Sequence, residues 1–378
     1  MASVETILVS GAGIGGLGTA IGLAQQGVGV RVIDAKENLT TLGSGITVQG
    51  NALRVLRDLG VWDEVRDAGF AFEGLGLRAP DPTGTVLVEL TELRTGGEDL
   101  PATLGIHRPD LARILLDRAL ALGVRVDHGV ALEEIEQDDD GVTATLSDGT
   151  TARCDLMVAA DGIRSHLRRL VGIEDGPRPT GMGIWRVFAP RPTSVTRTDL
   201  FYGGPSYIAG YCPTGEDSLY AYVVTDHDPH NATLNADQGL ARLQALSAAH
   251  HGPWDDIRPL MTDSSRINYT KFETHVVPAP WHRGRVVLVG DAAHSCPPTV
   301  AQGAAMALED AWVPSELLGG DSDQSIEEVL EGYTARRLPR ARVVVEGSVQ
   351  IGEWLMSGER GDVPGVMGRI SSMLTERP

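Results

Sequence analysis

The sequence predicts an α/β protein in which a Rossmann-like domain with a β-meander is joined to an inserted, mostly antiparallel β-sheet and to C-terminal helices. Three observations carry this prediction. The chain opens with a strand, turn, helix and strand, and a segment of period-two alternation follows near residue 140. A strand-rich segment then separates these elements from a last buried strand. The first domain is therefore predicted to be discontinuous in sequence.

A glycine-rich turn follows the first predicted strand. Thr6–Ser10 leads into Gly11-Ala12-Gly13-Ile14-Gly15-Gly16, and a helix over about 15–26 and a strand over 28–33 come next. Glycines let the backbone approach a pyrophosphate, and the N-terminus of the helix offers unpaired N–H groups to it. We therefore expect a dinucleotide to bind here, on Gly11, Gly13, Ile14, Gly15 and Gly16.

The second predicted strand ends at Asp34, 23 residues after Gly11. A carboxylate at this offset accepts hydrogen bonds from a ribose 2′-OH and repels a 2′-phosphate. The ribose role is favoured over that of an acidic turn residue by the strand and helix that precede it.

The next elements are two helices and the meander. One helix covers about 51–59, and another opens at Arg108-Pro109-Asp110, where proline suits the first turn. From Val130 to Arg153 apolar and polar residues alternate between turns at Asp140-Gly141 and Asp148-Gly149. A strand then leads into Asp161-Gly162. Such a meander is unlike a plain NAD dehydrogenase.

Residues from about 176 to 271 form the inserted segment. Twelve of the 18 aromatic residues of the chain lie between Trp185 and Trp281, which makes this segment the better candidate for an apolar ligand pocket. Aromatic enrichment is also typical of strands in general. The predicted strands are Ile184–Ala189, Leu200–Tyr202, Tyr207–Tyr211 and Leu219–Val224.

The chain then returns to the first domain. A buried strand over 285–289 ends at Gly290-Asp291, and Gln302-Gly303 opens a helix that runs to about Trp312. Further helices are predicted near 325–335 and 340–356. The predicted domains are a cofactor-binding domain of residues 1–75, 101–175 and 276–325, a substrate-binding domain of 76–100 and 176–275, and C-terminal helices over 326–378.

Composition narrows the classes of partner. The net charge of −19 argues against nucleic acid and anionic membranes, because both require a basic surface. Three scattered cysteines, Cys154, Cys212 and Cys296, indicate free thiols in a reducing compartment, so we expect a cytoplasmic location. The longest apolar stretch, 14–33, is broken by glycines and Arg31 and predicts no membrane span. No histidine is accompanied by other potential metal ligands in the sequence, so no metal is expected.

Three motifs, in order and over nearly the whole chain, resemble those of the single-component (group A) FAD-dependent aromatic hydroxylases. These are flavoprotein monooxygenases of the 4-hydroxybenzoate hydroxylase type. The resemblance implies an FAD-binding domain of the glutathione-reductase type. The motifs are Gly11–Gly16, Ala160-Asp161-Gly162-x-x-Ser165-x-x-Arg168 and Gly290-Asp291-Ala292-Ala293-His294-x-x-Pro297-Pro298-x-x-x-Gln302-Gly303.

The resemblance implies a set of FAD-binding residues. It assigns the pyrophosphate to the glycine turn, the adenosine ribose to Asp34 and the ribityl chain to Asp291. Helix N–H groups at Gly303 and Ala304 would face the flavin, where negative charge develops on reduction. The resemblance associates the pattern of Asp161-Gly162 and Arg168 with contacts to both FAD and NAD(P)H. The complete implied set is Gly11, Gly13, Ile14, Gly15, Gly16, Asp34, Ala35, Arg108, Val130, Asp161, Asp291, Pro298, Gly303 and Ala304.

The resemblance also implies a reaction. NADH or NADPH would reduce FAD, and O₂ would then form a flavin C4a-hydroperoxide that hydroxylates a small aromatic or heteroaromatic substrate. The chain has no second G-x-G-x-x-G motif, so NAD(P)H is expected to dock transiently on the FAD domain. Two alternatives stay open. One is a related flavoprotein acting on a non-aromatic or polycyclic substrate, as a reductase, an epoxidase or an antibiotic-modifying enzyme. The other is a non-catalytic flavin-binding module.

The sequence identifies no catalytic base. Thr47 stands where some hydroxypyridine-carboxylate relatives carry a histidine. The sequence leaves four points open. They are the substrate, the position hydroxylated, the choice of NADH or NADPH, and whether the protein is a monomer or a homodimer. Candidate residues for the substrate pocket or for catalysis, each with an equally good packing or solvent interpretation, are Arg186, Tyr202, Tyr207, Tyr211, Tyr222 and His294.

Overall fold

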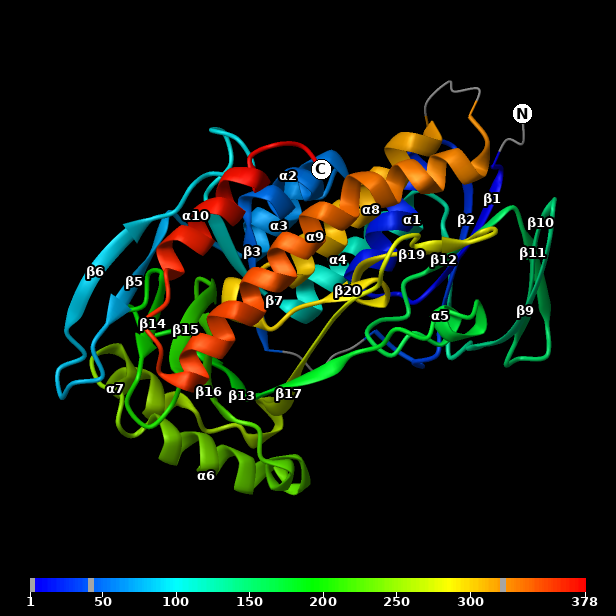
Figure 1. The fold of residues 1–378 in the computed structure, drawn as a ribbon. Coiled ribbons are helices and arrows are strands. Elements are labelled where there is room, and N and C mark those ends of the chain that lie inside the picture. The colour runs from blue at the N-terminus through cyan, green and yellow to red at the C-terminus, as the bar shows by residue number, and fades with distance from the viewer. Residues whose placement is uncertain (1–3, 40–43, 320–323) are drawn as a thin grey trace.

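The computed structural model describes residues 4–39, 44–319 and 324–378 of the 378-residue chain. Two sheets carry the fold (Figure 1). A mostly parallel sheet lies at the end of the molecule that holds the N-terminus, and a larger mixed sheet lies toward the other end. The long helix α9 (Ile326–Ser357) runs between the two ends.

The first sheet has the Rossmann-like arrangement that the sequence predicts. Its strand order is β18-β19-β12-β1-β2-β8, and all neighbours are parallel except β18 and β19. Parallel strands need crossover connections, and α1 (Ile14–Gln25) connects β1 to β2. The strands are β1 (Thr6–Ser10), β2 (Gly29–Asp34), β8 (Arg125–His128), β12 (Leu156–Ala159), β18 (His282–Arg283) and β19 (Val286–Leu288).

The predicted meander is confirmed as a three-stranded antiparallel sheet of order β11-β10-β9. It comprises β9 (Leu132–Asp138), β10 (Gly141–Leu146) and β11 (Thr151–Cys154). A second small sheet, of order β3-β7-β4, was not predicted. It comprises β3 (Gly45–Gln49), β4 (Phe70–Phe72) and β7 (Thr103–His107).

The inserted segment forms most of an eight-stranded sheet of order β20-β17-β13-β16-β15-β14-β5-β6. All pairs are antiparallel except β14 and β5, so the predicted antiparallel character is confirmed. The strands are β5 (Gly74–Arg78), β6 (Val86–Thr91), β13 (Arg178–Pro190), β14 (Thr198–Tyr202), β15 (Ile208–Gly215), β16 (Ser218–Asp226), β17 (Ile267–Val276) and β20 (His294–Ser295). The exact domain boundaries stay a prediction.

The remaining elements are helices. The α-helices not yet bounded are α2 (Gly50–Asp58), α3 (Trp62–Ala68), α4 (Arg108–Ala121), α5 (His166–Leu170), α6 (Ala236–Ser247), α7 (Pro253–Ile257), α8 (Gly303–Gly319) and α10 (Val363–Leu374). The 3₁₀ turns are η1 (Pro229–Thr233), η2 (Arg258–Leu260), η3 (Ser264–Arg266), η4 (Gly290–Ala292) and η5 (Pro298–Val300).

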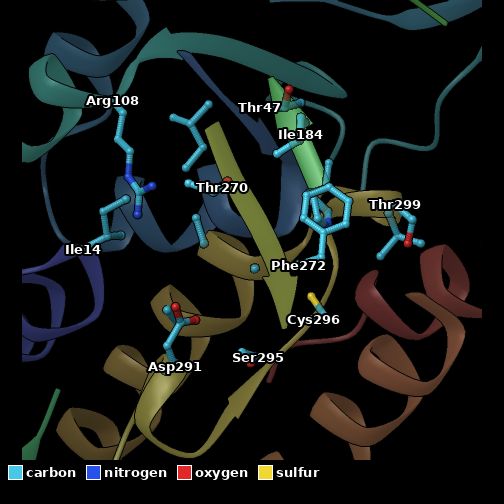
Figure 2. A pocket seen from close by; sticks show the side chains of 18 of the residues that line it. Ile14, Thr47, Arg108, Ile184, Thr270, Phe272, Asp291, Ser295, Cys296 and Thr299 are labelled. Carbon is cyan, nitrogen blue, oxygen red and sulfur yellow. The ribbon is translucent and has the colours of Figure 1, made fainter. Parts of the chain in front are cut away.

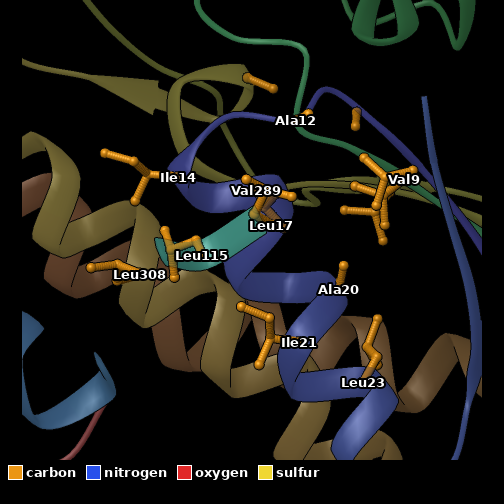
Figure 3. Packing of buried hydrophobic residues seen from close by; sticks show 14 of the residues in the cluster. Val9, Ala12, Ile14, Leu17, Ala20, Ile21, Leu23, Leu115, Val289 and Leu308 are labelled. Atoms are coloured by element: carbon orange, nitrogen blue, oxygen red, sulfur yellow. The ribbon is translucent and has the colours of Figure 1, made fainter. Parts of the chain in front are cut away.

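The main core lies where α1 packs between the parallel sheet and two other helices. Leu17 and Ile21 project from α1 toward Leu115 of α4 and Leu308 of α8 (Figure 3). All four side chains are buried, and each gains roughly 1.5–3 kcal/mol from leaving water. This packing places the N-terminus of α1 beside the N-terminus of α8.

The two faces of the eight-stranded sheet have different neighbours. One face packs against α6 and α7 through a buried cluster that includes Trp185, Tyr211 and Trp254. The opposite face carries Arg186, Leu200 and other half-buried side chains that line a cavity. Alternation along each strand therefore separates a structural face from a ligand-facing one.

The C-terminal helices differ from the prediction. The two helices expected near 325–335 and 340–356 form one helix, α9, with Pro339 inside it, and α10 was not predicted. Proline removes one backbone hydrogen bond, which favours a break. Here the flanking arginines, Arg337 and Arg340, are both bonded to Glu309 of α8, and these contacts hold the helix together across the proline.

A buried network of charges joins α8 and α9. Arg337 Nε lies 2.7 Å from Asp310 Oδ1, and its Nη1 lies 2.5 Å from Glu309 Oε2. Arg340 Nη2 lies 3.0 Å from Glu309 Oε1. Burial raises the pKa of Asp310, but the charges of His294 and Arg337 outweigh burial and hold that pKa at about 2. Both carboxylates are therefore ionised and paired.

We predict that Arg337→Met lowers the free energy of unfolding by about 3–5 kcal/mol, because it removes a buried cation that contacts both buried carboxylates. Denaturant unfolding measures the change. Arg336→Met is the matched control on the same helix, since Arg336 pairs with Glu316 near the surface and should cost less than about 1 kcal/mol. Equal losses in the two variants would contradict the importance of the buried network.

Candidate active site

A single cavity of about 2270 Å³ connects the glycine turn of the parallel sheet to the open face of the eight-stranded sheet. Its wall contains every residue of the predicted FAD-binding set except Gly16. In Figure 2, Arg108 reaches down toward Ile14 and Asp291, while Phe272, Cys296 and Thr299 lie on the other side. Residues spread over almost three hundred positions thus meet around one space, although their individual roles stay predictions.

The glycine turn leaves room for a ligand at one position and none at another. A Cβ on Gly16 would collide with the carbonyl oxygen of Gly11, so Gly16 is required by backbone packing. A Cβ on Gly13 would meet no protein atom within 4 Å. Gly13 is also the N-cap of α1, and no side chain caps this helix. The N–H groups at the start of α1 therefore face open space, as pyrophosphate binding requires.

Asp34 holds the turn as well as lining the cavity. Its Oδ2 accepts a hydrogen bond from the Ala12 N–H at 2.8 Å, and its Oδ1 accepts one from the Lys36 N–H at 2.8 Å. The Val130 N–H donates to the Asp34 carbonyl at 3.0 Å. Each carboxylate oxygen retains a second lone pair, so contact with a ribose hydroxyl is compatible with these bonds.

The Asp161 motif ties two segments together. Asp161 accepts hydrogen bonds from Ser165 Oγ at 2.5 Å and from the N–H groups of His166 and Leu167, so it caps α5. Arg168 is 2% exposed and donates to the Ala292 carbonyl at 2.7 Å. Arg168 is not among the residues that line the cavity, and its position indicates a structural link between the second and third motifs.

Asp291 and the start of α8 form the wall beside Arg108. Asp291 faces the cavity from η4, where burial raises the pKa of its carboxyl group while the charges of His294 and Arg108 lower it. Gly303 begins α8, and Pro298 lies in η5 just before it. This wall therefore presents a carboxylate, a cation and helix N–H groups together, which suits a polar ring edge and sugar hydroxyls.

The charged network described above also holds this wall in place. Asp310 Oδ2 accepts a hydrogen bond from the Gly290 N–H at 2.8 Å and lies 2.7 Å from His294 Nε2. Asn51 Nδ2 donates to Glu309 Oε1 at 2.9 Å and to Gln302 Oε1 at 3.1 Å. His294 is 3% exposed and does not line the cavity, which corrects its candidacy as a catalytic base.

Glu309, Asp310, Arg337 and Arg340 were not singled out from the sequence. The available signal was an acidic pair on one helix followed by two arginines three residues apart on the next. Charged residues usually lie at the surface, so this pattern is not distinctive without the tertiary structure.

Ala301 occupies a strained backbone position on the cavity wall. Its φ is +53° and its ψ +32°, in the left-handed region that costs a non-glycine residue about 1–2 kcal/mol. It stands where the Gly-Gln-Gly pattern of the resembled family has glycine. The strain places the Gln302 side chain within hydrogen-bonding distance of Gln49 and Asn51.

The substrate-pocket candidates separate into two groups. Arg186, Tyr202 and Tyr222 line the cavity, together with Tyr220, whose ring stacks on Tyr222 with centroids 5.3 Å apart. Tyr207 and Tyr211 do not line it. Tyr207 Oη donates to Asp226 at 2.6 Å, and Tyr211 Oη donates to Asp199 at 2.7 Å within the structural face of the sheet.

Arg186 is a half-buried cation in this part of the wall. Arg186 donates to Thr270 Oγ1 at 2.7 Å, and no carboxylate of the described residues forms an ion pair with it. Burial lowers its pKa to about 10, so it carries its charge at neutral pH. Burial raises the pKa of Tyr202 to about 12, and burial also raises those of Tyr220 and Tyr222. The tyrosines are thus neutral hydrogen-bond donors.

Comparison with known proteins decides the family. The family described as FAD binding domain matches residues 4–348. A relative from Bacillus subtilis (strain 168), named as an FAD-dependent monooxygenase, is 33% identical over 363 residues, covering 95% of this chain and 96% of the relative. The chain belongs to the FAD-dependent aromatic hydroxylases. The resemblance inferred from the three motifs is therefore confirmed.

Two further comparisons agree with this family. The 2-heptyl-3-hydroxy-4(1H)-quinolone synthase of Pseudomonas aeruginosa (strain UCBPP-PA14) is 32% identical over 82% of this chain and 80% of that protein. The crystal structure of HpxO from Klebsiella pneumoniae, complexed with FAD and uric acid, is 25% identical with a TM-score of 0.81, covering 98% of this chain and 92% of that one. FAD is the cofactor of this family, and the cradle at Gly13, Asp34 and Gly303 suits it.

Over residues 4–39, 44–319 and 324–378, no helix is long and apolar enough to cross a membrane. Within the same ranges, no group of three or more histidine, cysteine, aspartate or glutamate residues is arranged to hold a metal ion.

We predict that Gly13→Ala weakens FAD binding at least tenfold without destabilising the apoprotein, because its methyl group enters the space reserved for the pyrophosphate and touches no protein atom. Equilibrium titration of the apoprotein with FAD measures the first effect, and thermal unfolding measures the second. Gly16→Ala should instead destabilise the apoprotein itself. Unchanged FAD affinity in Gly13→Ala would mean that the pyrophosphate does not lie at this turn.

Proposed function

We propose that this protein hydroxylates an aromatic or heteroaromatic ring that carries an acidic hydroxyl, carbonyl or ring N–H group, using NAD(P)H and O₂. Bound FAD would supply the two-electron transfer and the activation of O₂. The family supports the reaction class, and the cavity supports the nature of the substrate. Uric acid in the HpxO complex and the quinolone of the Pseudomonas relative are both rings of this kind by name.

The observation that carries the proposal is the charge of Arg186 beside the neutral hydroxyl groups of Tyr220 and Tyr222 on the cavity wall. A cation in a low-dielectric site attracts an anion strongly and lowers the pKa of a hydroxyl group that touches it. An ionised ring hydroxyl makes the ring more electron-rich, which favours attack on an electrophilic oxygen. Arg186 would thus orient the substrate and activate it without a separate base.

The neighbouring residues complete this environment. Tyr220 and Tyr222 offer stacked rings against which a flat substrate packs, and Tyr220 Oη and Thr47 Oγ1 share a hydrogen bond of 3.0 Å. Burial raises the pKa of the Cys296 thiol to about 12, so Cys296 is protonated and contributes an apolar surface. Such a wall excludes water from the reacting groups.

We also propose a co-substrate, an oligomeric state and a location for this protein. NADH or NADPH would dock transiently on the FAD domain, since the chain carries one G-x-G-x-x-G motif. We expect a monomer or a homodimer and a cytoplasmic location. Free Cys154, Cys212 and Cys296 support a reducing compartment.

The proposed reaction is tested with FAD-loaded enzyme, NADH or NADPH, and a panel of phenols, hydroxypyridines and hydroxyquinolines. We expect at least one ring to accelerate NAD(P)H oxidation and to gain one oxygen atom by mass spectrometry. A gain of two hydrogens would instead identify a reductase. A panel in which no ring accelerates oxidation, or a protein that takes up no FAD, would contradict the proposal.

We predict that Arg186→Gln lowers kcat/KM for the accepted ring roughly ten- to hundredfold, because it removes a charge-assisted hydrogen bond worth about 1.5–3 kcal/mol. FAD affinity should not change. Arg186→Lys should restore part of the loss, since it keeps the charge without the planar geometry of guanidinium. Steady-state kinetics of the three forms measure the effect, and identical kcat/KM values would remove Arg186 from the substrate site.

A further inference from the structure

The ligand-facing side of the eight-stranded sheet is much longer than one aromatic ring. Cavity-lining residues come from seven consecutive strands of the sheet, from β17 through β13, β16, β15, β14 and β5 to β6. Neighbouring strands lie about 4.8 Å apart, so five steps separate β13, which carries Arg186, from β6, a distance of roughly 24 Å. A single ring at Arg186 fills only one end of this wall.

Strand register shows how the chemistry changes along the wall. Arg186 pairs with Tyr222, Tyr222 with Gly210, and Gly210 with Leu200. Leu200 then pairs with Leu77 of β5. The row is therefore polar on β13 and β16 and aliphatic on β14 and β5, and the change falls at Gly210, which has no side chain.

In the row beside it, Thr198 of β14 is polar, and the aliphatic residues lie on β5 and β6. Leu75 of β5 pairs with Leu90 of β6, and both line the cavity. The helix α10 also contributes Val363 and Met367 to the cavity wall. We call the space bounded by Leu75, Leu77, Leu90, Leu200, Val363 and Met367 the apolar arm. In Figure 1, α10 lies at the same end of the molecule as β5 and β6.

The apolar arm is open at its far end. Leu90 lines the cavity and is nevertheless 44% exposed, and every residue of β6 is exposed. Apolar side chains at an exposed sheet edge are unfavourable in water unless something covers them. The arm is continuous with the site of Arg186, so a ligand held there by its polar end would extend along this surface.

We infer that the apolar arm binds an unbranched hydrocarbon chain, so that the substrate is an amphiphile with its aromatic head at Arg186 and its tail along β14, β5 and β6. This inference rests on the proposed function for the identity of the head. The three strand steps from Gly210 to β6 span about 14 Å, which accommodates a chain several methylenes long. Burial of that chain supplies affinity that a ring alone lacks.

The test uses FAD-loaded enzyme and the series 2-methyl-, 2-butyl- and 2-heptyl-4-hydroxyquinoline, with Kd measured from the change in flavin absorbance or fluorescence. We expect Kd to fall about two- to fourfold per methylene, up to the equivalent of ~0.8 kcal/mol for each fully buried CH₂. The readout is binding, so it does not depend on turnover. A Kd that is independent of chain length in the wild type would overturn the inference.

A pair of leucines on the same strand gives the matched control. Leu90→Lys places a charge at the open end of the apolar arm. It should raise the Kd of the 2-heptyl compound at least tenfold and leave the Kd of the 2-methyl compound unchanged. Leu87 is 67% exposed and does not line the cavity, so Leu87→Lys should change neither. Equal effects of the two substitutions would overturn the inference, because the arm would then have no special role.

A second variant guards against misfolding of the edge strand. Leu77→Trp fills the arm from β5 and should abolish the gain from butyl to heptyl while keeping the gain from methyl to butyl. Failure of the inference is distinguishable from failure of the proposed function. Hydroxylation of rings without any chain dependence rejects only the arm. If decanoate, which has a hydrocarbon chain and no ring, binds while no ring is hydroxylated, the proposed function is rejected and the apolar arm is kept.

Discussion

The pairing of Asp310 and Glu309 with Arg337 and Arg340 is the interaction on which the rest of the site depends. Charges buried this deeply are tolerated only when they are paired and hydrogen-bonded. The network therefore fixes the positions of α8, α9 and the end of β19 relative to one another. Because Asp310 also binds the Gly290 N–H, the same carboxylate that anchors α9 positions the turn carrying Asp291. The cavity wall at Asp291 is therefore held by residues that do not themselves line the cavity.

The consequence is a division between a rigid frame and a variable wall. The frame consists of the parallel sheet, α1, α8 and the charged network, and it presents backbone N–H groups at Gly13 and Gly303 to the cavity. The eight-stranded sheet contributes side chains such as Arg186 and Tyr222 to the wall. Backbone donors tolerate many substitutions, whereas a side chain such as Arg186 sets the chemistry by itself. This separation explains how one cofactor frame serves relatives with different ring substrates.

Sequence reasoning succeeded where function depends on local backbone geometry. The glycine turn, Asp34 at the end of the second strand and the helix beginning at Gly303 are each defined by a few adjacent residues, and the structure places all of them on one cavity wall. It failed where long-range contacts decide. Pro339 predicts a break in the helix, but the contacts of Arg337 and Arg340 with Glu309 override that local preference. His294 and Tyr211 were plausible candidates by type, and packing directs both away from the cavity.

By itself, the sequence determined the cofactor, the family and the order of strands and helices around the three motifs, because each motif consists of residues close together in the chain. Only the tertiary structure decided which side chains share the substrate wall. Leu77 and Leu200 are neighbours because β5 pairs with β14 across more than a hundred residues, and Arg186 faces the cavity because the register of β13 places Trp185 on the opposite face. A shift of one residue would reverse both assignments, and the packing of a whole sheet, rather than any local pattern, sets that register.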